Sequence, residues 1–200
     1  MANDASDIPP SLLAAARVGE EAAWRQLVDL LYPQVAGTIR NHLRRGADRD
    51  DVAQEVFVKI FANLGQYAGH QPFEHWVSRI TLNACRDWLR RLAARPLTSY
   101  SDLTDDEREI LERTLASDAP AADESPAMLH ELLERLLATL GPNEQIVIRL
   151  LDLEQRSVQD VCNLTGWGDS KVKVTAMRAR RKLADQMQRF ELRSSSSSSP

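Results

Sequence analysis

The sequence of 200 residues has few of the features that mark secreted, membrane-spanning or metal-binding proteins. Its two cysteines, Cys85 and Cys162, lie far apart within apolar patterns, too few for a disulfide framework or a cysteine-rich metal cluster. We expect both thiols to be reduced and mostly buried. No apolar run approaches the roughly 18 residues that span a bilayer, and the acidic start MANDASDIPP lacks the pattern of a secretory signal. The composition therefore predicts a cytoplasmic chain without membrane insertion.

Motifs for catalysis are also missing. The sequence shows no nucleophile beside a base, no metal-ligand spacing around His70 or elsewhere, and no glycine loop of the kind that holds phosphates. An enzyme is therefore a weak alternative, and we expect no catalytic residue, no metal and no cofactor. Internal repeats are absent as well.

What the chain does have is charge that is strongly segregated. Its net charge is −4 and its pI is near 5.6. Between Lys171 and Arg193, however, eight bases face two acids, a net charge of +6. Between Ser101 and Glu131, ten acids face two bases, a net charge of −8. The charge of each segment therefore says more about its partners than the total does.

Helical periodicity predicts an all-α fold of two small domains joined by an acidic flexible linker. Domain bounds of 1–93 and 127–193 are expected, with the linker at 94–126 and a disordered serine tail at 194–200. Tyr32-Pro33, Gly46 with Asp48, and Gly141-Pro142 are predicted breaks. The predicted helices cover 11–31, 34–45, 50–64, 72–92, 128–140, 143–153, 157–164 and 170–188, with a further short helix at 104–115.

The last two predicted helices are typical of a helix-turn-helix. Ser157 and Asp160 form a capping pattern at the start of the first, and Gly166 suits the left-handed residue at its end. In the second, Val172, Ala176, Ala179 and Leu183 are spaced to pack. A second stripe holds Lys171, Thr175, Arg178 and Lys182, flanked by Lys173, Arg180 and Arg181. Such cations reach phosphates and base edges in a major groove, although a solvated basic face is the alternative.

The predicted helix 72–92 also has two faces. Phe73, Val77, Ile80, Ala84 and Trp88 are spaced to pack, whereas Arg79, Asn83, Arg86 and Arg90 form a cationic ridge with Arg91 beside it. Tyr67, His70, Gln71 and Trp76 lie in or next to the preceding loop. A basic ridge beside aromatic rings is what a single-stranded nucleic acid requires; the alternative is that Trp76 and Trp88 belong only to the core. The helix before that loop, 50–64, shows Asp51, Gln54, Glu55 and Val58 on a face that suits a protein partner; a solvated surface is the alternative.

Together these segments resemble the bacterial RNA polymerase sigma factors of the small, two-domain extracytoplasmic-function (ECF) type, within the sigma-70 family. The resemblance covers most of 20–92 and 128–185. It rests on ADRDDVAQEVFVKIFANLGQY, FEHWVSRITLNACRDWLRR, LATLGPNEQIVIRLLDLEQRSVQDVCNLTGW and KVKVTAMRARRKL.

The resemblance implies specific roles. Asp51, Gln54 and Glu55, with Phe57 beneath, would bind the clamp helices of the polymerase largest subunit. The loop 65–72 would capture a flipped base, and Trp76, Arg79, Asn83, Arg86 and Arg90 would read and melt the downstream promoter element. Lys171, Lys173, Thr175, Arg178 and Arg181 would read the upstream element, while their domain docks on the flap of the second-largest subunit. An anti-sigma factor is a further expected partner.

One segment departs from the family. TGWGDSKVKV stands where the family more often has a Gly-Thr-Val-Lys-Ser-Arg-like run, so the base preference at the upstream element does not transfer. A stand-alone DNA-binding regulator that uses only 128–188 remains the alternative function; it leaves 48–92 without a role.

Overall fold

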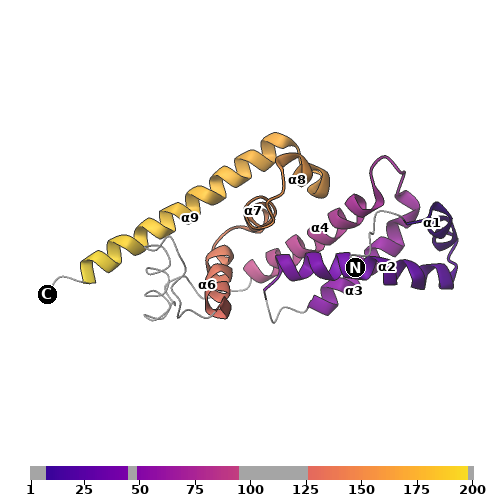
Figure 1. Ribbon diagram of the computed structural model, residues 1–200, viewed down its shortest axis with the longest axis horizontal. Helices are drawn as coiled ribbons and strands as arrows, with labels where there is room; N and C mark the ends of the chain where they lie inside the picture. The colour runs from indigo at the N-terminus through magenta and orange to yellow at the C-terminus, as the bar shows by residue number, and fades with distance from the viewer. Residues whose placement is uncertain (1–7, 45–48, 95–125, 198–200) are drawn as a thin grey trace.

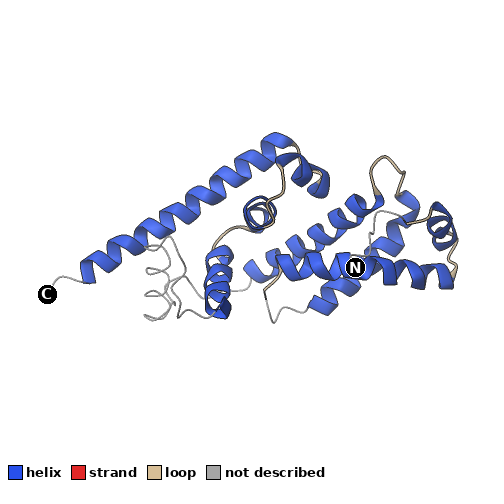
Figure 2. Cartoon of the chain, viewed as in Figure 1, coloured by secondary structure: helices blue, strands red, loops and turns tan. Residues whose placement is uncertain are grey.

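The computed structural model describes residues 8–44, 49–94 and 126–197, and no strand occurs within these ranges (Figures 1 and 2). The N-terminal part consists of α1 (Pro10–Arg17), α2 (Glu21–His42), α3 (Arg49–Asn63), the 3₁₀ turn η2 (Leu64–Gln66) and α4 (Phe73–Ala93). The C-terminal part consists of α6 (Pro126–Ala138), α7 (Pro142–Ile148), the π-helical turn η4 (Arg149–Leu153), α8 (Val158–Thr165) and α9 (Asp169–Ser197). The all-α prediction is confirmed.

One predicted break is wrong, and one real break was not predicted. Helix α2 runs through Pro33, which removes one backbone donor but leaves a continuous buried stripe of Leu27, Leu31, Val35 and Ile39 on both sides of it. Burial of that stripe outweighs the lost hydrogen bond. The real break falls earlier, at Gly19, whose φ of 85° lies in the left-handed region that glycine adopts readily.

The predicted boundary at Gly141-Pro142 agrees with the structure, whereas the predicted end of the last helix does not. The Gly141-Pro142 break separates α6 from α7, and the Glu144 carboxylate accepts a hydrogen bond of 2.8 Å from the Gly141 N–H. Helix α9 continues to Ser197, four residues into the serine run that the sequence predicts to be disordered. The predicted helix 104–115 and nearly all of the linker lie outside the described residues.

The two parts share a hydrophobic core. Helix α4 packs against α2 and α3 and also against α7 and α8, so it lies between the two sets of helices (Figure 1). One buried cluster contains Val77 and Cys85 of α4 together with Ile146, Val161 and Val172 of the C-terminal part. Trp76 and Trp88 are half-buried against this cluster. A second, smaller cluster joins α6, α7 and α9 through Leu137, Leu140, Ile148 and Ala179.

The described residues lack both membrane-spanning helices and groups that could hold a metal ion. Among the described residues, no helix is long and apolar enough to cross a bilayer. Within the same ranges, no group of three or more His, Cys, Asp or Glu side chains is arranged to hold a metal ion.

Candidate nucleic-acid interface

The helix-turn-helix forms as the local sequence predicts. The Ser157 hydroxyl accepts a hydrogen bond of 3.1 Å from the Asp160 N–H, and the Asp160 carboxylate accepts one of 3.2 Å from the Ser157 N–H. These reciprocal bonds satisfy free donors at the start of α8. Gly166 ends α8 in the left-handed conformation, with φ of 73°. Helix α9 then begins at Asp169, and its own residues Val172, Ala176 and Ala179 are buried on the side that packs against the protein.

The cations of α9 differ in how they are held. Some pair with acids of the same part of the chain: Lys173 with Asp169 at 2.9 Å, Arg180 with Asp152 at 2.6 Å, and Lys182 with Glu144 at 2.8 Å. The Lys171 ammonium lies 4.1 Å from the centroid of the Trp167 ring. Among the described residues, Arg178 and Arg181 have no such partner and are exposed.

The exposed side of α9 differs in part from the polar stripe that the sequence predicted. Thr175 is half-buried, and Lys182 is engaged by Glu144. Two exposed apolar residues that sequence reasoning passed over, Val174 and Met177, lie on the outward side instead. The sequence could have indicated this, because Val174 and Met177 are three positions apart and fall on the side of the helix opposite the residues predicted to pack.

On α4, Arg79 of the predicted cationic ridge lies beneath α8. Its guanidinium donates to the Gln71 side-chain oxygen at 2.9 Å and to the Asn163 carbonyl oxygen at 3.4 Å. A Cβ added to Gly166 would come within 2.7 Å of the Arg79 Nε. Arg79 and Gly166 are therefore in close contact across the two parts of the chain, which the sequence did not predict.

The rest of the ridge is less covered. Asn83 and Arg86 are half-buried and Arg90 is exposed. The Asp87 carboxylate lies 3.5 Å from Arg86 and 3.8 Å from Arg90, so one acid holds two of the predicted DNA contacts. These ridge cations face a mixture of protein groups and solvent.

The loop before α4 is ordered by aromatic contacts. The rings of Tyr67, Phe73 and Trp76 lie 4.9 to 5.6 Å apart, and the Tyr67 hydroxyl donates a hydrogen bond of 2.6 Å to the Gln71 carbonyl. His70 is exposed at the tip. The predicted loop residues and Trp76 thus lie close together.

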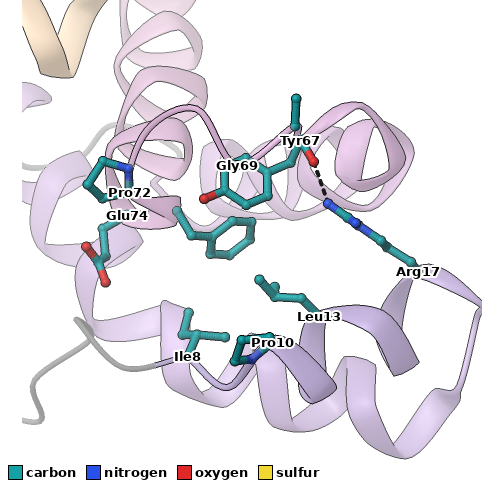
Figure 3. A pocket seen from close by; sticks show the side chains of 10 residues that line it. Ile8, Pro10, Leu13, Arg17, Tyr67, Gly69, Pro72 and Glu74 are labelled. Carbon is teal, nitrogen blue, oxygen red and sulfur yellow. Dashed lines mark hydrogen bonds between the residues drawn. The ribbon is translucent and has the colours of Figure 1, made fainter.

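A pocket of about 520 Å³ opens between this loop and α1 (Figure 3). Tyr67, Gly69 and Pro72 line one side, while Leu13 and Arg17 of α1 line the other. The Arg17 guanidinium donates to the Tyr67 carbonyl and lies 6.0 Å from the Tyr67 ring centroid. Sequence reasoning missed the contribution of α1, because nothing local relates it to a loop 50 residues away.

Helix α3 presents a separate surface with polar and apolar groups side by side. Asp51 and Gln54 are exposed, whereas Glu55 is tied to Lys59 at 2.6 Å and to Arg91 at 3.2 Å. The hydrogen bond from Lys59 is the main cause that lowers the pKa of the Glu55 carboxyl, and Arg91 adds to it.

Exposed apolar side chains extend this α3 surface. Val58 is 66% exposed and Phe61 56% exposed. The two lie three positions apart, so they are neighbours on one face of α3. Phe57 stacks on Tyr32 of α2 with ring centroids 6.4 Å apart. Tyr32 and Phe61 were not among the predicted residues.

Buried polar groups connect the two parts of the chain behind these surfaces. The Arg149 guanidinium donates to the Asn41 carbonyl at 2.9 Å and to the Glu134 carboxylate at 2.6 Å. His42 Nε2 lies 3.4 Å from the Glu154 carboxylate. Burial lowers the pKa of His42, against the opposing effect of Glu154. Burial also raises the pKa of the Cys85 thiol to about 12, so this cysteine stays protonated.

Comparison with known proteins identifies the family. Residues 27–95 match the Sigma-70 region 2 family, and residues 130–183 match the family described as Sigma-70, region 4. The chain belongs to the sigma-70 family. The first match covers most of α2 and all of α3 and α4, which a stand-alone helix-turn-helix regulator would not need, so that alternative function is set aside.

Individual relatives indicate which type of sigma factor this is. The chain is 27% identical over 173 residues to the ECF RNA polymerase sigma factor SigM of Mycobacterium tuberculosis H37Rv, covering 86% of this chain and 81% of that protein. It is 29% identical over 167 residues to the RNA polymerase sigma factor YlaC of Bacillus subtilis, covering 82% and 93%. It is 25% identical over 180 residues to the ECF RNA polymerase sigma-E factor of Escherichia coli K12, covering 88% and 93%. This chain is accordingly an ECF sigma factor, which binds RNA polymerase and recognises promoters.

A solved structure shares the fold. The structure of CnrH in complex with the cytosolic domain of CnrY aligns with 92% of this chain and 98% of that chain, with a TM-score of 0.53 and 24% sequence identity. The arrangement of helices is thus that of a known protein.

Proposed function

We propose that this sigma factor divides its work among three surfaces: α3 binds the polymerase, α4 with its preceding loop opens the downstream promoter element, and α9 reads the upstream element. In this proposal, 1–93 and 127–193 are the two working domains and 94–126 sets their spacing. The observation that carries it is the separation of the exposed α3 face from two cationic faces on α4 and α9.

The polymerase surface would consist of Asp51, Gln54 and Glu55 with the apolar group around them. An exposed Val58 and Phe61 beside the Tyr32–Phe57 stack supply the apolar centre that a protein interface needs. Asp51 and Gln54 at its edge would orient the partner, the clamp helices of the largest subunit. The C-terminal domain would dock on the flap of the second-largest subunit.

The pocket beside the loop is the proposed receiver of an unstacked base. A volume of about 520 Å³ exceeds that of one nucleobase, and the Tyr67 ring offers a face on which a base can stack. His70 and Gln71 would contact the base or its neighbours, with Trp76 beneath them. Capture of the base would offset the few kcal/mol that unstacking costs. Melting would then need no catalytic group, in keeping with an initiation factor that is not itself an enzyme.

Binding along the opened strand falls to the α4 ridge: Arg79, Asn83, Arg86 and Arg90. Since Arg79 is engaged by Gln71 and by the Asn163 carbonyl, the promoter strand would reach it only after α8 moves away. This supports a chain that binds the downstream element when polymerase has separated the two domains, and poorly on its own.

The upstream element would be read by α9, with Lys171, Lys173, Arg178 and Arg181 toward phosphates or bases and Thr175 at the margin. Arg178 and Arg181 need to give up no protein partner among the described residues, whereas Lys173 must leave Asp169. A cluster of this size should make binding sensitive to salt.

Two further points belong to the proposal. By likeness to CnrH, which was solved with the cytosolic domain of CnrY, we expect a regulatory protein of the anti-sigma type to bind here. Work with RNA polymerase would place the chain in the cytoplasm. The acidic linker would compete with DNA for the cationic faces; its deletion should then raise the affinity of the free chain for DNA.

Association with core polymerase tests the first step. Fluorescently labelled chain should bind core polymerase, and Val58→Asp or Gln54→Ala should weaken that binding by roughly tenfold, since each lies in the centre or edge of the interface. Gln188→Ala, at an exposed site on the far end of α9, is the matched control and should bind as the parent chain does. Equal affinity of all four proteins, with unchanged circular dichroism, would remove α3 from the polymerase interface.

A further inference from the structure

The outward side of α9 carries an apolar centre between two rows of cations. Successive residues of an α-helix are about 100° apart around its axis. Ser170, Val174, Met177 and Arg181 therefore fall on one stripe, roughly 160° from the buried stripe of Val172, Ala176 and Ala179. Val174 is 41% exposed and Met177 63% exposed. This stripe, named here the outward spine, points directly away from the protein.

Cations flank the outward spine on both sides. Lys171 and Arg178 lie on one side, and Lys173 and Arg180 lie on the other. All four are exposed, and Lys173 and Arg180 pair with Asp169 and Asp152 in the free chain. Once these two pairs open, the two rows are placed to contact the phosphates along both walls of a major groove. The residues between them then face the base edges.

Apolar side chains recognise one feature of a base edge in the major groove. The thymine C5 methyl group is apolar, and the other three bases show mainly donors and acceptors there. Contact with Val174 and Met177 would displace water from the donors and acceptors of the other bases without replacing the lost hydrogen bonds, which is unfavourable. A thymine methyl gains contact instead.

We propose that Val174 and Met177 determine specificity at the upstream element by contact with thymine methyl groups. Val174 and Met177 are separated by about 4.5 Å along the helix axis, close to the spacing of neighbouring base pairs, so one or two adjacent thymines form the predicted site. Arg181, at the end of the outward spine, reads a guanine or a phosphate beside them. This inference rests on the proposed role of α9 and adds the class of base that it selects.

Deoxyuridine tests this inference, since it differs from thymidine only in lacking the methyl group. Holoenzyme assembled from core polymerase and this chain first selects active upstream elements from a randomised template library. Each thymine of the selected element is then replaced singly by deoxyuridine, and holoenzyme affinity is measured. One or two replacements should weaken binding by about three- to fivefold, as expected for one buried methyl group.

Protein variants of the outward spine, measured on the same thymine and uracil templates, form the second half of the test. Val174→Ala and Met177→Ala should bind thymine and uracil templates with nearly equal affinity, because the contact that distinguishes them is gone. Lys173→Ala, which keeps the apolar pair, should weaken binding to both templates while retaining the thymine preference. Exposed positions make all three changes compatible with folding, which circular dichroism checks.

The outcomes separate this inference from the broader function. A selected element without thymine, or one in which no deoxyuridine replacement matters, would overturn the inference while holoenzyme activity upholds the sigma function. A full thymine preference in both Val174→Ala and Met177→Ala would also overturn it. Absence of any transcription in the selection would overturn the proposed function and this inference with it.

Discussion

Replacement of Arg149 by alanine should destabilise the chain more than loss of an exposed ion pair. Arg149 and Glu134 are 5% and 4% exposed, and their charged groups lie 2.6 Å apart. Without Arg149, the Glu134 carboxylate stays buried and uncompensated, and the Asn41 carbonyl loses a donor at 2.9 Å. Loss of one partner of such a pair costs about 3–5 kcal/mol, which corresponds to a fall in melting temperature of roughly 6–20 °C for a chain of this length.

Two comparisons make the test specific. Combined Arg149→Met and Glu134→Leu substitution should recover most of the stability, because it removes both charges and leaves similar volume. Arg25→Ala is the control for an exposed pair: Arg25 and Glu21 have side chains 75% and 78% exposed, and their loss should change the free energy of unfolding by less than about 1 kcal/mol.

Urea unfolding of the four proteins, followed by circular dichroism, gives the free energies. The reasoning fails if Arg149→Ala unfolds within about 1 kcal/mol of the parent chain, or if the double substitution is as unstable as the single one. Either result would mean that the Arg149–Glu134 pair is open to water in solution. The contact with Asn41, which joins the two parts of the chain, would then be weak as well.

Two further predictions concern the same junction. Because burial lowers the pKa of His42 below its usual 6.5, unfolding takes up a proton when the pH falls below that value. The free energy of unfolding should therefore decrease from pH 7 towards pH 5, by at most about 1.4 kcal/mol per pH unit. Urea titrations of His42→Gln, which keeps the surrounding Glu154, Arg149 and Glu134, should lack this component of the pH dependence. Gly166→Ala should destabilise by about 1–3 kcal/mol, because φ is 73° and the added Cβ meets Arg79 at 2.7 Å, whereas Gly168→Ala, with nothing within 4 Å, should change little in thermal unfolding.

Local features of this fold are predictable from sequence. The capping pair at the start of α8, the left-handed Gly166 and the buried stripe of α9 each depend on residues within a few positions of one another. Local hydrogen bonds and helical spacing dictate them whatever the rest of the chain does. Helical spacing likewise allowed Asp51, Gln54, Glu55 and Val58 of α3 to be assigned to one face from the sequence.

Contacts between distant segments were not predictable. Nothing near Arg79 in the sequence indicates that its guanidinium meets the Asn163 carbonyl, 84 positions away. The pocket between α1 and the loop, and the Arg149 contact with Asn41, have the same origin in tertiary packing. Pro33 shows the reverse error: a strong local signal for a break is overridden because residues on both sides of it are buried along one stripe.

Transcription in vitro by purified core polymerase tests the central claim most directly, namely that two DNA-binding faces of one chain select a promoter jointly on the polymerase. With a randomised template library, the account predicts transcripts only when this chain is present, from templates that share an upstream and a downstream element. Altering either element, or Arg79 on one face and Arg181 on the other, should abolish them. Transcripts that need only one element, or none that depend on the chain, would contradict it.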